Sequence, residues 1–171
     1  AAQKCTDYLF KYLDIIQKIY IFCGNGNNGG DGFAIARMLY YLNFDVEIYI
    51  NKSLQSFSKD ATINFNLLKG LSGIEIKDFS EFDSSEIDEN EVIIDAVFGS
   101  GLNRKLEGEL AETIEKMNSA KGTKISIDIP SGLFSDEMIE TDAVVFNADV
   151  TLSFQFYKKA FLHPETGKYC G

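Results

Sequence analysis

The chain has 171 residues, 45% of them hydrophobic, and a formal net charge of −10. This length suits a single domain with one core, and the negative charge, without a dense Lys/Arg cluster, argues against a nucleic-acid surface. No apolar run could span a bilayer and no signal-peptide pattern opens the chain, so we expect no membrane partner. Cys5, Cys23 and Cys170 form no CxxC pair, which predicts a reducing compartment, the cytoplasm. Histidine chemistry would rest on His163 alone.

Short β-rich segments alternate along the chain with segments of helical periodicity. In chain order we expect a helix marked by Cys5, Leu9, Tyr12, Leu13 and Ile16, a strand at 18–23, a helix with Ile35, Met38, Leu39 and Leu42 on one face, a strand at 45–50, a helix at 61–68, a strand at 91–98, a helix at 108–119, and strands at 124–129 and 148–154. This alternation predicts right-handed βαβ crossovers, and hence an α/β fold with a mostly parallel sheet covered on both faces.

Three polar motifs follow expected strands: GNGNNGGDG (24–32), DAVFGSGLNRKLEG (95–108) and DIPSG (128–132). Ligands of such sheets bind beyond the carboxyl ends of the strands. Each motif carries an aspartate, namely Asp31, Asp95 and Asp128. The three motifs together predict a site at this edge of the sheet.

The glycine-rich motif matches the dinucleotide fingerprint Gly24-x-Gly26-x-x-Gly29. The acid that should bind the ribose is missing, because the candidate Glu47 lies inside a strand. We also expect Asp31 in the first helical turn, where it would repel a pyrophosphate. A tight strand-to-helix turn is the alternative, with Asp31 as a favourable first-turn acid. Four glycines and three asparagines within 24–30 favour a ligand loop.

Asp95 and Asp128 could each simply cap a neighbouring loop. Their position at the ends of two apolar strands favours a shared site instead. In the IPSG turn the hydroxyl of Ser131 can point inward, although an ordinary proline turn would explain the same residues.

The motifs GNGNNGGDG, DAVFGSGLNR, SIDIPSG and TLSFQFYKKAFLHPE resemble, in order and spacing, the NAD(P)H-hydrate epimerase family, also known as the YjeF N-terminal domain. The resemblance covers the chain from Ile19 onward. It implies a Rossmann-like three-layer α/β/α sandwich and an isomerase that interconverts the R and S epimers of NADH or NADPH hydrated at C6. It also implies that residues 1–171 are a single domain truncated at both ends, that the protein is a homodimer, and that an ADP-dependent dehydratase, fused or separate, uses the product.

The resemblance further implies a bound potassium ion, with the side chains of Asn28, Asp95 and Ser131 as its ligands. These are hard oxygen donors, which suit alkali cations. The implied nucleotide contacts are Asn27, Asn28, Gly29, Gly30, Asp31, Gly99, Ser100, Gly101, Leu102, Asn103, Arg104, Lys105 and Asp128. In this arrangement the cation offsets the acids, while backbone N–H groups and Arg104 hold the phosphates.

The implied reaction needs a well-placed acid/base, and Asp128 is the first candidate for it. Lys158 is a candidate partner, although a surface lysine after a strand explains it equally well. Two other functions compete with epimerisation. One is an NAD-dependent dehydrogenase, which the missing ribose acid disfavours. The other is a catalytically idle nucleotide- or protein-binding module.

Overall fold

The computed structural model describes residues 1–53, 56–136, 142–154 and 158–171. Residues 155–157, inside the last motif of the resemblance, therefore lie outside the described part. The elements in chain order are α1 (Ala2–Tyr12), β1 (Lys18–Cys23), α2 (Asn27–Tyr41), β2 (Asp45–Ile50), α3 (Lys59–Lys69), β3 (Glu75–Asp78), the 3-10 turns η1 (Phe79–Glu81) and η2 (Ser84–Glu86), β4 (Val92–Ala96), α4 (Gly108–Ser119), β5 (Thr123–Ile127), β6 (Val150–Leu152), α5 (Lys159–Leu162) and α6 (Pro164–Gly167).

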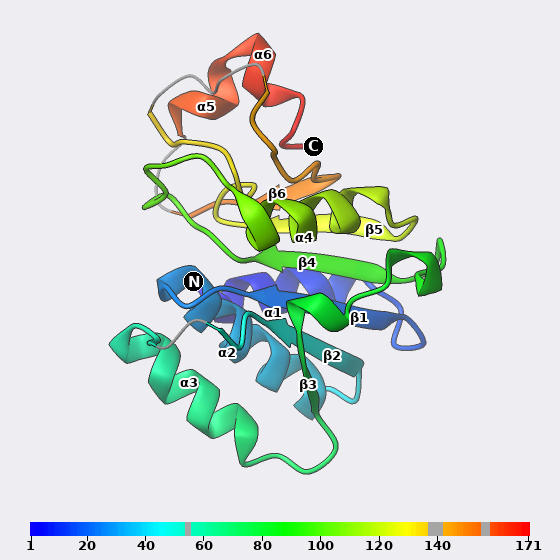
Figure 1. Ribbon diagram of the computed structural model, residues 1–171. Coiled ribbons are helices and arrows are strands. Elements are labelled where there is room, and N and C mark those ends of the chain that lie inside the picture. Colours follow the sequence, from blue (N-terminus) through cyan, green and yellow to red (C-terminus); the bar gives the residue numbers. More distant parts are fainter. Residues whose placement is uncertain (54–55, 137–141, 155–157) are drawn as a thin grey trace.

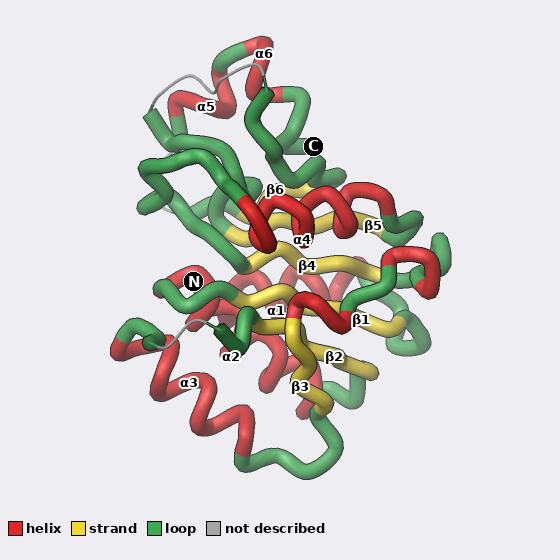
Figure 2. Tube along the Cα trace, in the orientation of Figure 1, coloured by secondary structure: helices red, strands yellow, loops and turns green. Residues whose placement is uncertain are grey.

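The six strands form one parallel sheet in the order β3-β2-β1-β4-β5-β6 (Figures 1 and 2). From β1 the chain first builds outward through β2 and β3, and then returns to build the other half from β4. The strand order therefore reverses between β1 and β4. In open parallel sheets this reversal leaves a crevice at the carboxyl ends of the two strands, which is where ligands bind.

Two hydrophobic clusters cover the two faces of the sheet. Ile19 and Ile21 of β1 belong to the cluster that includes residues of α1, α2 and α3. The alternate residues Tyr20 and Phe22 belong to the cluster that contains residues of α4 and η1. Because successive side chains of a strand point to opposite faces, β1 contributes to both layers. The predicted three-layer α/β/α architecture is confirmed.

Most predicted elements are confirmed, with shifted ends. The first helix ends at Tyr12 instead of reaching Ile16, because Leu13 is already extended. The strand expected at 91–98 ends at Ala96, and the strand expected at 124–129 ends at Ile127. The sequence analysis missed β3, η1, η2, α5 and α6, each only three or four residues long. Among the described residues, no helix is long and apolar enough to cross a membrane.

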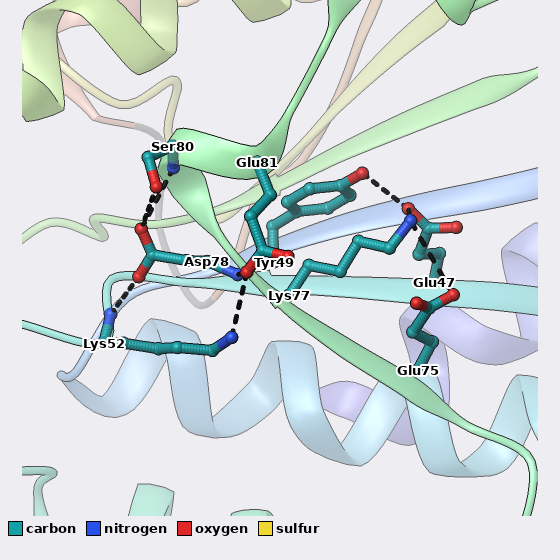
Figure 3. A network of polar contacts seen from close by, with 8 residues as sticks. All are labelled: Glu47, Tyr49, Lys52, Glu75, Lys77, Asp78, Ser80 and Glu81. Carbon is teal, nitrogen blue, oxygen red and sulfur yellow. Dashed lines mark hydrogen bonds and ion pairs between the residues drawn. The ribbon is translucent and has the colours of Figure 1, made fainter.

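Glu47, the candidate for a ribose-binding acid, belongs to a polar network on β2 and β3 (Figure 3). Its carboxylate lies 2.7 Å from Lys18 Nζ and 2.9 Å from Lys77 Nζ. It also accepts a hydrogen bond from the Tyr49 hydroxyl at 2.5 Å. Burial raises the pKa of Glu47, but the bonds from Lys18, Tyr49 and Lys77 outweigh burial, and the pKa is lowered. Glu47 therefore stabilises the sheet and is committed to these partners.

Candidate functional site

A cleft of about 680 Å³ opens where the strand order reverses. Its walls come from the segment between β1 and α2, the loop after β4, the end of β5 and the segment after β6. The residues that line it are Asn25, Gly26, Asn27, Asn28, Asp31, Val97, Phe98, Gly99, Ser100, Gly101, Leu102, Asn103, Arg104, Asp128 and Phe154.

The cleft brings together most of the residues predicted to bind the nucleotide. Those in its wall are Asn27, Asn28, Asp31, Gly99, Ser100, Gly101, Leu102, Asn103, Arg104 and Asp128. Gly29 and Gly30 are buried and do not line it. Lys105 lines a smaller hollow next to the cleft and pairs with Asp142 at 2.5 Å.

The glycine-rich motif is more helical than expected. Helix α2 begins at Asn27, so Asp31 is its fifth residue and lies beyond the first turn, contrary to the prediction. Gly26 is the exposed N-cap, and a Cβ there would meet nothing within 4 Å. The start of α2 therefore presents free backbone N–H groups at the cleft, an arrangement that attracts anions.

The buried glycines of this motif serve packing within the protein. A Cβ on Gly24 would lie 1.9 Å from the carbonyl oxygen of Val97, and a Cβ on Gly29 would lie 1.8 Å from the carbonyl oxygen of Gly24. A Cβ on Gly30 would meet the backbone of Ala61 in α3 at 3.0 Å. We expected Gly29 and Gly30 to let a ligand approach, but what approaches these two positions is the protein's own backbone.

Asp128 is fixed at the point where β5 ends. Its φ of +70° lies in the left-handed region, which is uncommon outside glycine and recurs at functional sites. Its Oδ1 lies 2.8 Å from Lys158 Nζ, and its Oδ2 accepts a hydrogen bond from the Ser100 backbone N–H at 3.0 Å. Its own N–H donates to the Leu152 carbonyl of β6 at 2.9 Å.

Lys158 is an inward-facing partner and not a surface lysine. Only 12% of its side chain is exposed, the same fraction as for Asp128. Its Nζ donates a second hydrogen bond to the Phe154 carbonyl at 2.8 Å. The ammonium group is thus held between a carboxylate and a carbonyl beside the cleft. A proton donor and a proton acceptor therefore lie in contact beside the cleft.

Asp95, which we expected at the rim, is fully buried behind the cleft and does not line it. Oδ1 accepts hydrogen bonds from Ser131 Oγ at 2.6 Å and from Val97 N at 3.1 Å. Oδ2 accepts from Ser131 N at 2.7 Å and from Ser126 Oγ at 3.3 Å. Burial raises the pKa of Asp95 to about 6, although these hydrogen bonds lower it. The Ser131 hydroxyl points inward, which is one of the two readings that the IPSG turn left open.

The backbone of Phe98 links Ser131, the partner of Asp95, to Asn28 at the start of α2. Its N–H donates to Ser131 Oγ at 2.9 Å, and its carbonyl accepts from Asn28 Nδ2 at 2.8 Å. Asn28 also donates to the Ile127 carbonyl at 3.1 Å. Two residues farther on, the Ser100 N–H binds Asp128. Asn28, Asp95, Ser131 and Asp128 are therefore connected through one short loop.

Ser126 and Phe154 are among the residues of this site that were not predicted from the sequence. Ser126 is fully buried and donates to Asp95, and its signal was a lone hydroxyl in the apolar strand KISIDI. Phe154 lines the cleft and binds Lys158 through its carbonyl. Phe154 is part of the quoted motif TLSF, but nothing in its residue type marks it as a site residue.

Known proteins are similar to this chain over most of its length. The family model described as YjeF-related protein N-terminus matches residues 1–160. An NAD(P)H-hydrate epimerase from Oenococcus oeni is 34% identical over 154 residues, 90% of this chain and 70% of the relative. A bifunctional NAD(P)H-hydrate repair enzyme Nnr from Dictyoglomus turgidum is 40% identical over 141 residues, 78% of this chain and 27% of that protein.

A solved structure shares the fold. The crystal structure of the yeast protein YNL200c matches with a TM-score of 0.73 and 20% identity, and the match covers 92% of this chain and 67% of the yeast chain. With the family model matched over residues 1–160 and relatives above 30% identity, the chain belongs to the family of YjeF-related protein N-termini.

Proposed function

We propose that this chain is an NAD(P)H-hydrate epimerase, an isomerase that interconverts the R and S epimers of NADH or NADPH hydrated at C6. The relatives from Oenococcus oeni and Rhodopirellula baltica carry this name. The observation that carries the proposal is the largely buried ion pair of Asp128 and Lys158, held beside a cleft at the carboxyl edge of a parallel sheet. The chain spans 70% and 62% of the lengths of these two relatives. The activity of a full-length protein is therefore proposed from similarity.

The chemistry fits an acid/base pair. In the hydrated nucleotide the C6 hydroxyl lies next to the ring nitrogen, whose lone pair can expel it once the leaving oxygen receives a proton. The product is an iminium cation, to which water adds from either face. Asp128 and Lys158 would donate and recover that proton. A positioned acid/base contributes about 10²–10⁴-fold to such a step.

The nucleotide's charged part would bind at the other side of the same cleft. The free N–H groups at the start of α2 favour phosphate oxygens, and Arg104 adds a charged, bidentate donor. Asn27 and Asn28 supply amide groups beside them. Phosphates held there would leave the nicotinamide ring to lie toward Asp128 and Lys158.

A potassium ion is proposed as the cofactor, at Asn28, Asp95 and Ser131. The donor set fits in kind, because it offers an amide, a carboxylate and a hydroxyl next to the carbonyls of Phe98 and Ile127. The Asp95 carboxylate is fully buried and has no ion-pair partner among the described residues, so a cation would offset its charge. Among the residues that the structure describes, no group of three His, Cys, Asp or Glu residues could hold a metal ion. This favours a monovalent ion over zinc. When bound, the ion would supply positive charge beneath the cleft.

The S epimer would then pass to an ADP-dependent dehydratase, fused or separate. Relatives from Dictyoglomus turgidum and Methanothermobacter thermautotrophicus are named as bifunctional repair enzymes. A homodimer and a cytoplasmic location stay predictions of the sequence.

Incubating the protein with the purified R epimer of hydrated NADH separates the candidate functions. An epimerase forms the S epimer faster than the uncatalysed background, without a change in the redox state of the nucleotide. A dehydrogenase would need an acid for the ribose, and Glu47 is engaged by Lys18, Lys77 and Tyr49 instead. An idle binding module would bind the nucleotide and leave the background rate unchanged.

A further inference from the structure

The acid/base pair is anchored at one place in the cleft wall. Both carboxylate oxygens of Asp128 are engaged, Oδ1 by Lys158 Nζ at 2.8 Å and Oδ2 by the Ser100 N–H at 3.0 Å. The Asp128 backbone is tied to Leu152 of β6, and the ammonium group of Lys158 is tied to the Phe154 carbonyl. These anchors come from separate segments, so the pair is not free to swing around a bound ring.

The rest of the cleft wall offers few groups that could do the same work. Besides Asp128, the titratable side chains among the cleft-lining described residues are Asp31 and Arg104. Arginine keeps its proton in proteins and is a poor acid/base. Asp31 lies on α2, where it also lines the small hollow between α2 and α3. Within the part of the chain that the structure describes, Asp31 is therefore the single competitor for a second acid/base role.

Epimerisation requires that the hydroxyl leave one face of the ring and that water return to the other face. A pair that reaches one face assists water only on the side from which the hydroxyl left. Water that attacks the opposite face forgoes that assistance, a disadvantage of about 10²-fold. The alternative route is rotation of the cationic ring about its bond to the ribose, which presents its other face to the pair. Water that returns to the face from which the hydroxyl left needs neither unassisted attack nor rotation of the ring.

We infer that this site also exchanges the C6 hydroxyl oxygen of the hydrated nucleotide with solvent water, with retention at C6, and does so more often than it inverts that carbon. This inference rests on the proposed function. In each exchange the C6–O bond breaks as the ring nitrogen's lone pair forms the C=N bond, and a proton from the pair leaves with the oxygen as water. A second water then forms the new C6–O bond, the electron pair returns to nitrogen, and the added water's proton returns to the pair.

The test follows ¹⁸O from labelled water into the nucleotide. The protein is incubated with the R epimer of hydrated NADH in H₂¹⁸O, and initial rates are measured by mass spectrometry after the epimers are separated. We expect ¹⁸O to enter the recovered R epimer about 10²-fold faster than the S epimer appears, after subtraction of the uncatalysed rates, because inversion forgoes the assistance of the pair. If ¹⁸O enters R no faster than S forms, retention is not favoured over inversion and the inference is overturned. If S fails to form above background, the proposed function fails. The exchange activity is then judged by itself: ¹⁸O entry into R above the uncatalysed rate supports it, and entry at the uncatalysed rate overturns it.

Two variants identify the group responsible. Asp128→Asn should lower exchange and inversion together by about 10²-fold, since one pair serves both. Asp31→Asn should leave the ratio of exchange to inversion unchanged, whatever it does to binding. A loss of inversion with exchange retained would assign the second face to Asp31 and overturn the one-sided assignment. Asp60→Asn is the matched control, because Asp60 is exposed on α3 and does not line the cleft, and we expect both rates to stay as in the parent.

Discussion

Lys158 Nζ lies 2.8 Å from Asp128 Oδ1, although 30 residues separate the two in the chain. Their contact follows from the sheet order, because Asp128 ends β5, and the segment that leads to Lys158 leaves the neighbouring strand β6. The loop after β4 closes the group from the other side through the Ser100 N–H. Three adjacent strands thus assemble the proposed acid/base at their carboxyl ends.

Replacing Lys158 by methionine tests the ammonium group while keeping much of its aliphatic stem. The change leaves Asp128 without its cation, so we expect kcat for epimerisation to fall by about 10²-fold with KM changed far less. Lys159→Met is the matched control. The Lys159 side chain is 77% exposed and lies 3.7 Å from Asp136, so its loss should have no effect. Normal turnover of Lys158→Met would reduce the lysine to a structural role.

At Gly99 the loop after β4 passes close to Asp128 and Asn28. A Cβ there would lie 3.1 Å from Asp128 Oδ2 and 3.2 Å from Asn28 Cβ, so the carboxylate must shift. We expect Gly99→Ala to lower kcat by about 10-fold, because small misplacements of a reacting group are costly. Gly101→Ala has open space around it and should be neutral. Equal kinetics for the two variants would show that the position of Asp128 is not critical.

Glu47 gives a prediction about stability and pH. In the folded state its pKa is lowered below its ordinary value of 4.5. The carboxylate therefore stabilises the fold above pH 4.5, and this contribution is lost as the pH falls through the lowered pKa. Glu47→Gln should cost about 2 kcal/mol of unfolding free energy at pH 7, since it removes charge-assisted hydrogen bonds with two lysines. Denaturant unfolding should show this difference shrink below pH 4.5, and a difference that persists at pH 2–3 would contradict it.

The proposed cation is tested by stability and by binding. Melting temperature and affinity for the hydrated nucleotide should be higher in potassium chloride than in an equal concentration of a large organic cation, since a cation offsets the buried charge of Asp95. Asp95→Asn removes that charge and should abolish the difference. Asp60→Asn, an exposed change on α3, should keep it. A parent protein that behaves identically in both salts rules the ion out.

The order of strands and helices was predictable, because it depends on local periodicity. Strand β3 was missed, since the four residues EIKD carry no apolar run. The burial of Asp95 was also missed, because its partners Ser126 and Ser131 lie 31 and 36 residues away in the chain. The packing role of the glycines of the first motif was missed because most of their neighbours are also distant in the chain. Their close neighbours, such as Val97 opposite Gly24, are set by the sheet and not by adjacent sequence.

The most direct test of the central claim is the rate of R-to-S interconversion of hydrated NADH by the parent protein and by Asp128→Asn, with nucleotide affinity measured by calorimetry on both. The parent should equilibrate the epimers well above the uncatalysed rate. Asp128→Asn should be slower by about 10²-fold or more while it binds the nucleotide with nearly unchanged affinity. Near-normal interconversion by Asp128→Asn would contradict the assignment of the acid/base to Asp128.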